Sequence, residues 1–309
     1  MKRCPSPFTL LALYGAASLH LASADTTIPT PVEERIATKV NALNTIYIGR
    51  HLEPIHLDVG NLKAEEIPSL KWSQGTFWHI YVAPSTFVDC DSGTGFPNAI
   101  IRDDLVEKGT VYGKKPVPNW SSSRAVFEAK PWIHAFLGYL PQNLGRPQTQ
   151  FNFDEGDTNQ YYDGYWIIVW PRIDARGYPF EKDDLVVQIS EKYGLTSCAL
   201  YFDSDYKEAP GQFISKGDGI SKAGASAAEL VKKFLPNATL GPSRAELRVV
   251  NLNNLFEIAD LNQLKAERTA RLAWRIEFSF LSDASQLRYH ALVINIDALT
   301  GEVLGGNLK

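Results

Sequence analysis

The segment Ile296-Asp297-Ala298-Leu299-Thr300-Gly301-Glu302-Val303-Leu304 predicts a tight turn between two β-strands. A strand is expected over residues 289–296, which are rich in apolar and β-branched side chains, and a short last strand begins after Glu302. Gly301 suits the turn, because glycine adopts a positive φ without a steric penalty. The end of the chain is therefore predicted to be a β-hairpin.

More strands and a helix precede this hairpin. Residues 271–280 alternate apolar with polar side chains, which indicates a half-buried strand, and residues 246–250 have a second strand pattern. Residues 220–235 place apolar side chains at helical spacing, and Pro236 stops the helix. A helix laid across one face of an antiparallel sheet buries both apolar surfaces, so we expect an α+β unit over residues 219–309.

The same order of a helix, several strands and a glycine turn occurs earlier in the chain, over residues 121–203. Ser123 can cap the helix of this unit, and Pro131 indicates that the helix either kinks or begins there. Tyr193-Gly194-Leu195 takes the place that Thr300-Gly301-Glu302 has in the last unit. Strands are expected at about 148–153, 164–173, 185–190 and 195–202.

A divergent first unit is expected over residues 25–107. Thr30-Pro31-Val32-Glu33 is typical of a helix start, with a capping Thr, Pro at the first helical position and Glu three residues after the cap. Strands follow at 76–82 and 86–89, and Ser92-Gly93-Thr94-Gly95 makes the turn. The predicted fold class is therefore α+β, with tandem units of one helix packed on a curved antiparallel sheet.

The N-terminus has the three parts of a secretory signal peptide. Lys2 and Arg3 are followed by an apolar stretch from residue 8 to residue 21 and then by Ala22-Ser23-Ala24. This stretch has about 14 residues, whereas a membrane span takes about 20. We expect residues 1–24 to be removed and the mature chain to be secreted or periplasmic, with no membrane span. An N-terminal membrane anchor is the alternative.

Composition and charge exclude several classes of protein. The 309 residues are 44% hydrophobic and 21% charged, which excludes disorder over most of the length. The net charge of -4 becomes -6 when the two basic residues of the signal peptide are removed, and sequence-independent nucleic-acid binding needs a positive field instead. The mature chain keeps Cys90 and Cys198. In an oxidising compartment two cysteines favour one disulfide, and two separate buried thiols are the alternative.

The strand over residues 271–277, Arg-Leu-Ala-Trp-Arg-Ile-Glu, together with the turn over 296–304 resembles the end of a PepSY-type domain, and the likeness extends over residues 219–306. Residues 165–202 resemble related repeats, with Ser190 in the usual place of Asp and Tyr193 in that of Thr. The resemblance implies a cystatin-like fold of the secreted bacterial type. It also implies binding of a protein or peptide, such as a peptidase that is inhibited or regulated, with no catalytic residues and no cofactor.

Residues 89–95, Asp-Cys-Asp-Ser-Gly-Thr-Gly, contain the active-site tetrapeptide of aspartic peptidases. Two aspartates share a proton in those enzymes, so a single Asp91 would need a homodimer. A polar turn at the place of the glycine turn, or a calcium site with Asp89 and Asp91, would explain the same residues. The sequence has no Gly-x-Ser-x-Gly and no phosphate-binding glycine loop. We expect a protein without enzymatic activity; an Asp91 peptidase and a structural cell-envelope protein are the alternatives.

Two other groups of residues are candidates for binding. Tyr165, Trp166 and Trp170 could form a platform for a peptide or a sugar, or they could belong to a central strand covered on both faces. Residues 51–58 place His51, Glu53, His56 and Asp58 close together. The two histidines are five apart with Pro54 between them, so they would not share a helical face, and we expect a polar loop and no metal site.

Overall fold

The computed structural model describes residues 28–57, 62–68, 76–105, 110–112, 114–153, 160–281 and 289–309. The predicted signal peptide, residues 1–24, lies outside these ranges. Among the helices of the described residues, none has the length and apolar character that a membrane span needs.

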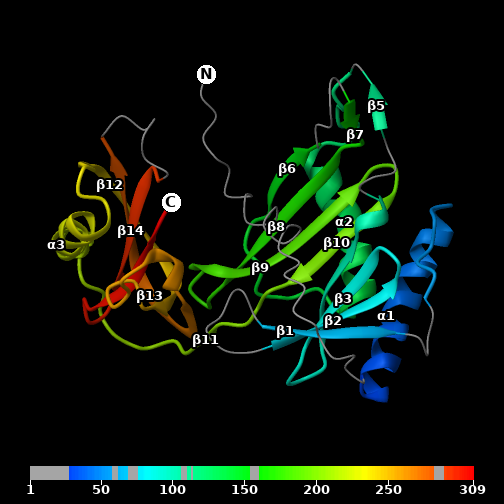
Figure 1. Ribbon diagram of the computed structural model, residues 1–309, viewed down its shortest axis with the longest axis horizontal. Helices are drawn as coiled ribbons and strands as arrows, with labels where there is room; N and C mark the ends of the chain where they lie inside the picture. Colours follow the sequence, from blue (N-terminus) through cyan, green and yellow to red (C-terminus); the bar gives the residue numbers. More distant parts are fainter. Residues whose placement is uncertain are drawn as a thin grey trace.

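The described chain is an α+β fold with three helices and a large mixed sheet, which confirms the predicted fold class at this level (Figure 1). Each helix is followed by four strands that pair antiparallel in chain order. The first set is α1 (Thr30–Gly49), β1 (Lys63–Pro68), β2 (Thr76–Ala83), β3 (Thr86–Asp91) and β4 (Pro97–Arg102). The second is α2 (Ser122–Leu137), β6 (Gln148–Asn152), β8 (Tyr165–Ile173), β9 (Pro179–Ser190) and β10 (Gly194–Leu200). The third is α3 (Lys216–Phe234), β12 (Leu240–Asn253), β13 (Ala266–Phe280), β14 (Ala291–Asp297) and β15 (Val303–Leu308).

Smaller elements connect these sets. A two-stranded sheet pairs β5 (Thr110–Tyr112) with β7 (Gln160–Tyr162), and β11 (Asp205–Tyr206) runs parallel to β13. Short 3-10 helices occupy Asp103–Leu105 and Leu261–Gln263.

The first two sets form one layer, because β4 pairs antiparallel with β10. The resulting run of strands is β1-β2-β3-β4-β10-β9-β8-β6. Helices α1 and α2 contact each other, and α2 also contacts β6, β8, β9 and β10. Side chains of both helices and of these strands share a single core, whose largest fully buried members include Trp132, Tyr47, Phe136 and Ile168.

The third set has its own core under α3 and lies at the other end of the molecule from α1 in Figure 1. It joins the rest of the sheet through one parallel bridge, between Val249 of β12 and Phe180 of β9. A buried polar network adjoins this joint. Asp183 is completely buried and accepts hydrogen bonds from Arg172 Nη1 at 2.8 Å and from Ser204 Oγ at 2.6 Å. Asn251 Nδ2 of β12 donates to Ser204 Oγ at 3.1 Å and so connects the third set to this network.

The structure changes several element bounds that the sequence predicts. The second helix is capped by Ser121, whose Oγ accepts a hydrogen bond from the N–H of Arg124, and not by Ser123. The helix begins at Ser122 and continues past Pro131, because Trp132 and Phe136 beyond the proline are buried in the core. Two strands of the first set, β1 and β4, were not predicted. Charged residues make up much of β1, and the glycine turn directly precedes β4.

Candidate functional site

Asp91 lies at the start of the turn between β3 and β4, and its carboxylate holds that turn together. Asp91 Oδ1 accepts a hydrogen bond from the N–H of Thr94 at 2.8 Å, and the backbone carbonyl of Asp91 accepts one from Gly95 at 2.7 Å. Arg35 Nη1 donates to the carbonyl oxygen of Gly95, also at 2.8 Å. The other carboxylate oxygen of Asp91 lies 3.8 Å from Arg268 Nη2. The carboxylate is therefore engaged by a hairpin turn and a cation.

The turn between β14 and β15 repeats this arrangement. Asp297 Oδ1 accepts hydrogen bonds from Leu299 and Thr300, and the backbone carbonyl of Asp297 accepts one from Gly301. The second carboxylate oxygen of Asp297 lies 3.3 Å from Arg271. Gly95 and Gly301, each four residues after the aspartate, have φ values of 61° and 73°. The tetrapeptide is thus part of a recurring hairpin turn, which is the polar-turn explanation of these residues.

The turn between β9 and β10 is built in the same way with a serine. Ser190 Oγ accepts hydrogen bonds from the N–H groups of Lys192 and Tyr193, and Gly194 has a φ of 81°. A methyl group on Gly194 would lie 2.9 Å from the Trp132 ring, so glycine is also required by the core. The Ser190 hydroxyl thus accepts the backbone hydrogen bonds that a carboxylate accepts in the other two turns, and it carries no charge.

Cys90 and Cys198 are completely buried free thiols. They lie on β3 and β10, with β4 between these strands. Two strand spacings amount to about 10 Å, whereas the Cα atoms of a disulfide lie within about 7 Å of each other. Burial raises the pKa of each thiol to about 12, and Asp89 adds to the rise at Cys90. This structure therefore has the two separate thiols and not the disulfide.

Trp166 and Trp170 belong to the core, which corrects the expectation of an aromatic platform. Both side chains are only 5% exposed and pack in the core that α1 and α2 cover, while Tyr165 is half-buried on the other face of β8. Trp166 Nε1 donates a hydrogen bond to Glu191 at 3.0 Å. Burial opposes ionisation of Glu191, but hydrogen bonds from Trp120 N–H and the Trp166 indole outweigh it and lower the pKa of Glu191. Alternation predicted correctly which residues of β8 lie together on one face. It could not show which face the helices cover.

His51 and His56 lie in the connection after α1. His51 follows the helix with a φ of 58°, and His56 lines an open groove beside α1. Asn44 of α1 fixes this connection, because its amide both donates to the carbonyl and accepts from the N–H of Ile55. Within the described ranges, no group of three or more His, Cys, Asp or Glu side chains is arranged to hold a metal ion. Asp58 lies outside those ranges.

A cluster of aromatic and carboxylate side chains lies on the face of β2 and β3 opposite the helices; we call Tyr81, His79, Phe87 and Asp89 the β2–β3 cluster. Val88 and Ile80, the alternate residues of these strands, are in the core, so the cluster is on the uncovered face. His79 Nδ1 lies 2.7 Å from Asp89 Oδ1, and the His79 ring contacts Phe87 and Tyr81 at centroid distances of 4.1 and 4.9 Å.

The β2–β3 cluster is accessible at its outer end. Tyr81 is 39% exposed, and the side chains of His79 and Asp89 are 16% and 25% exposed. Burial of its ring, together with Glu65 and Asp89, raises the pKa of Tyr81, so its hydroxyl is a hydrogen-bond donor at neutral pH. Sequence reasoning missed this cluster, although aromatic residues at every second position of residues 77–81 are a signal for it.

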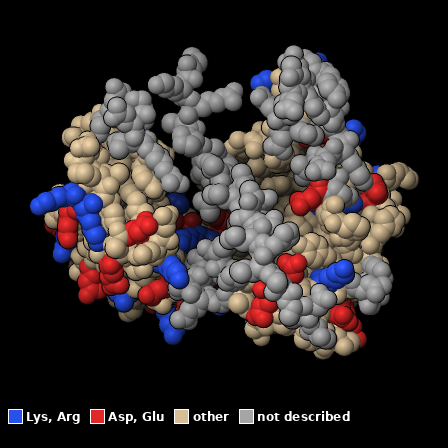
Figure 2. Space-filling model, in the orientation of Figure 1, with Lys and Arg blue, Asp and Glu red and all other residues tan. Residues whose placement is uncertain are grey.

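The face of the molecule in Figure 2 carries no single-sign field over the described residues. Lys and Arg are interspersed there with Asp and Glu on both halves of the molecule. Such a mixed surface fits the small net charge and does not resemble the basic stripe of a nucleic-acid-binding protein.

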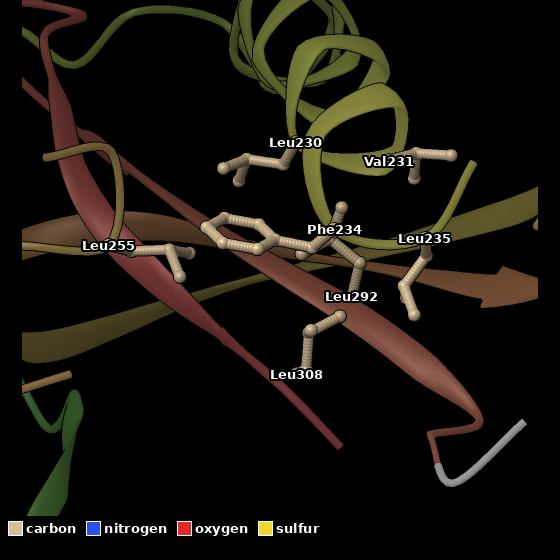
Figure 3. Close-up of a pocket in the computed structure, with 7 residues that line it drawn as sticks. All are labelled: Leu230, Val231, Phe234, Leu235, Leu255, Leu292 and Leu308. Carbon is tan, nitrogen blue, oxygen red and sulfur yellow. The ribbon is translucent and has the colours of Figure 1, made fainter. Parts of the chain in front are cut away.

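An apolar slot lies between the last turns of α3 and the strands β14 and β15 (Figure 3). The slot is too narrow to admit a water molecule, and no side chain that lines it carries a hydrogen-bonding group. The lining residues are Leu230, Val231, Phe234, Leu235, Leu255, Leu292 and Leu308.

Comparison with known proteins gives no family. No family model matches the chain, and no curated protein matches it significantly. Two solved structures are similar in part. The C-terminal domain of Bacillus megaterium YpeB is 14% identical, with 91% of this chain and 97% of that chain covered and a TM-score of 0.38. An uncharacterized protein from Eubacterium rectale is 13% identical, with coverages of 91% and 83% and a TM-score of 0.49.

Proposed function

We propose that the chain is a secreted, non-catalytic protein of three tandem PepSY-like units that binds a protein or peptide partner. The units are residues 25–107, 121–203 and 219–309, after a signal peptide over residues 1–24. The partner class that the sequence resemblance favours is a peptidase, which the protein would inhibit or regulate.

The repeated order of elements supports the three units. A helix and four antiparallel strands occur three times, with the last two strands of each set joined by a turn that an Asp or Ser side chain caps. In all three turns a glycine with positive φ comes four residues after the capping side chain, at Gly95, Gly194 and Gly301. Three unrelated turn segments would not be expected to share this spacing, so it supports a repeat.

The β2–β3 cluster is the observation that carries the binding function. Tyr81 and its neighbours present aromatic surface and a carboxylate on a sheet face that α1 and α2 leave uncovered. Aromatic side chains with a polar group are typical anchors of protein interfaces, because they contribute much contact area and lose few rotatable bonds on binding. Glu65 of β1 lies opposite His79 of β2 and adds a second carboxylate. A peptide with basic and aromatic residues therefore fits this surface best.

A peptide-display selection against the mature chain tests this function. We expect enrichment of peptides with Lys or Arg beside an aromatic residue, and a loss of affinity of about tenfold or more for Tyr81→Ala, the size of a single interface anchor. Phe127→Ala is the matched control, since Phe127 is a 64% exposed aromatic on α2, on the helix side of the sheet. Equal binding by all three proteins, or no enriched peptide, would overturn the proposal.

The peptidase part of the proposal needs a separate assay. Representative secreted metallo-, serine, cysteine and aspartic peptidases are assayed with and without the mature chain. We expect at least one to be slowed, and Tyr81→Ala to restore its rate. If none is slowed, the partner is not a peptidase of these classes, and the peptide selection alone decides the binding function.

A further inference from the structure

The sheet face that carries the β2–β3 cluster continues across the neighbouring strands β4, β10, β9 and β8. On β4, Ala99 lies directly opposite Asp89 of the cluster. Ala199 of β10 lies opposite Ala99, and Val186 of β9 lies opposite Ala199, so one row of side chains crosses these strands. We call five residues of this face the covered patch, three of them in that row and two in the next: Ala99, Ala199, Val186, Ser197 and Ile167.

The covered patch is buried, although α1 and α2 lie on the other face of the sheet. Residues that alternate with its members, such as Ile100 and Cys198, belong to the core under these helices. The members of the patch are between 1% and 5% exposed, whereas Tyr81, farther along the same face, is 39% exposed. Yet the four apolar members belong to none of the hydrophobic cores of the described residues. Their burial therefore needs a cover that those cores do not supply.

The cover is apolar where it meets Ser197. The Oγ of Ser197 is buried and has no hydrogen-bond partner among the described residues. A hydroxyl in water, or under a polar cover, would have a partner, so the group that excludes water from it offers neither a donor nor an acceptor. The rest of the covered patch is aliphatic and uncharged, which suits an apolar segment of chain.

The N-terminal segment has the composition and the starting point for this cover. Residues 8–21 contain no Asp, Glu, Lys or Arg. Ile28, the first described residue, is buried in the core before α1, and Val32 lies against the glycine turn at Gly95. Because β4 begins directly after that turn, the chain that precedes Ile28 leaves the core beside the strand that carries Ala99.

The segment is also long enough. Four adjacent strands lie across about 15 Å, and an extended chain advances about 3.3 Å per residue. The connection from Leu21 to Ile28 therefore spans up to about 23 Å, enough to pass around the end of the sheet. The apolar stretch before it reaches about 45 Å when extended and about 21 Å as a helix, so either form crosses the covered patch.

We propose that residues 1–24, as long as they remain attached, dock their apolar stretch on the covered patch, and that removal of the segment opens this face. The covered patch adjoins the β2–β3 cluster, so the docked segment excludes an extended partner from the cluster. Cleavage then switches binding on. This consequence rests on the proposed function, whereas the docking itself does not.

Thiol labelling of Ser197→Cys tests the docking. The variant is produced in the cytoplasm as residues 1–309 and as residues 25–309, and mass spectrometry of the digested protein reports modification at residue 197 apart from the native cysteines. We expect modification to be at least about tenfold slower in the full chain, as for a face that is covered about 90% of the time. This ratio should not change with protein concentration, because the segment acts within its own chain.

Two further labelling variants serve as controls. Phe127→Cys lies on the helix side of the sheet, where Phe127 is 64% exposed, and should react at the same rate in both proteins. Ala199→Cys is labelled in parallel, so that misfolding of one variant cannot decide the outcome. Circular dichroism melts show which variants are folded.

Substitutions within the N-terminal segment identify it as the cover. Leu11→Asp/Leu13→Asp puts charges into the apolar stretch, so in the full chain it should raise the labelling rate at residue 197 to that of the mature chain. Lys2→Ala/Arg3→Ala, outside the stretch, should leave the rate unchanged. Equal rates in the folded full and mature chains, or protection that Leu11→Asp/Leu13→Asp leaves intact, would refute the docking.

The labelling result and the binding function can fail separately. A peptide from the display selection should bind the mature chain at least about tenfold more tightly than the full chain, since it must displace the docked segment. Equal affinities would refute the switch. A selection that yields no peptide would count against the proposed function and leave the labelling result standing.

Discussion

At the scale of single residues, the capping side chain of each hairpin turn has more effect on the fold than its position in a loop would indicate. Asp297 is the clearest case. Its side chain is 6% exposed, two backbone N–H groups donate to one of its oxygens, and Arg271 lies beside the other. Asp91 makes one such backbone bond with a carboxylate that is 26% exposed.

We expect Asp297→Ala to lower the free energy of unfolding by about 2 kcal/mol, because two part-buried backbone N–H groups lose their acceptor. Asp91→Ala should cost about 1 kcal/mol, since water can reach its turn. Urea unfolding followed by circular dichroism measures both values. An equal or larger loss for Asp91→Ala would contradict this ranking, and Asn at either position should recover part of the loss, because its oxygen keeps the acceptor.

The two buried thiols predict a loss of stability at alkaline pH. Their pKa in the folded chain is raised to about 12, from an ordinary value of 9.0. The unfolded chain therefore releases these protons first, so the stabilisation is complete below pH 9 and is lost as the pH rises from there towards 12. Each thiol contributes up to about 1.4 kcal/mol per pH unit in that window.

Urea unfolding of the wild-type chain and of Cys90→Ala/Cys198→Ala between pH 8 and 11 checks this prediction. We expect the double variant to have the shallower pH dependence, whatever its absolute stability. Native thiols should also react slowly with a chromogenic disulfide reagent at pH 8, and fully only after unfolding. Parallel pH profiles for the two proteins would show that the thiols do not titrate as their burial requires.

At the scale of elements, Glu128 connects α1 to α2. Its side chain is 8% exposed, and it pairs with Arg50 of the α1 terminus at 2.9 Å and with Arg124 one turn earlier on α2. The Arg50 guanidinium also lies over the Trp132 ring, 5.4 Å from its centroid. The carboxylate therefore organises two cations at the point where the helices meet.

We expect Glu128→Ala to lower the free energy of unfolding by about 1–2 kcal/mol, because Arg50 loses the partner that fixes it against α2. Arg124→Ala removes the exposed cation of an i,i+4 pair and leaves Arg50 on Glu128, so it should cost only about 0.3–0.5 kcal/mol. Thermal or urea unfolding compares the two. Equal losses would mean that the α1–α2 contact does not depend on the Arg50 pair.

The bounds of the elements show where local sequence suffices. Helical spacing predicted α1, because periodicity acts within one or two turns. The predicted cap is wrong: the helix begins at Thr30, with Pro29 at the N-cap and no side chain that caps it. β1 was missed, since Lys63–Pro68 is a charged strand that pairs, among the described residues, with β2 alone. Charged side chains protect an edge strand from pairing with other molecules. They also interrupt the apolar alternation by which a strand is predicted from sequence.

At the scale of the whole molecule, the first two helix-and-strand sets share one core and the third set has its own. Tyr47 of α1 donates a hydrogen bond to the Leu195 carbonyl of β10, and its ring lies 4.6 Å from that of Trp132 on α2. The β4–β10 ladder closes the same interface. Neither of these two sets buries its apolar surface alone.

This sharing predicts how fragments behave. A fragment of residues 25–203 should fold cooperatively, because it keeps the whole shared core. A fragment of residues 121–203 should not, because α2 loses α1 and the β10 edge loses β4. Circular dichroism melts and gel filtration compare the two. A monomeric, cooperatively unfolding 121–203 fragment would contradict the shared core.

The sequence by itself determined the turns, the helices and most strands, because capping side chains, positive-φ glycines and alternation act over a few residues. It also indicated the α+β class and the repeated order of elements. Only the tertiary structure decided which strand edges pair and which face of each strand is covered. Alternation separates the two faces of a strand but does not say where the helices lie, so Trp166 and Trp170 are core residues while Tyr81 is exposed. Likewise, β4, β10 and β15 follow similar turns, and only contacts made across space show that β4 pairs with β10 while β15 lies against the end of β12.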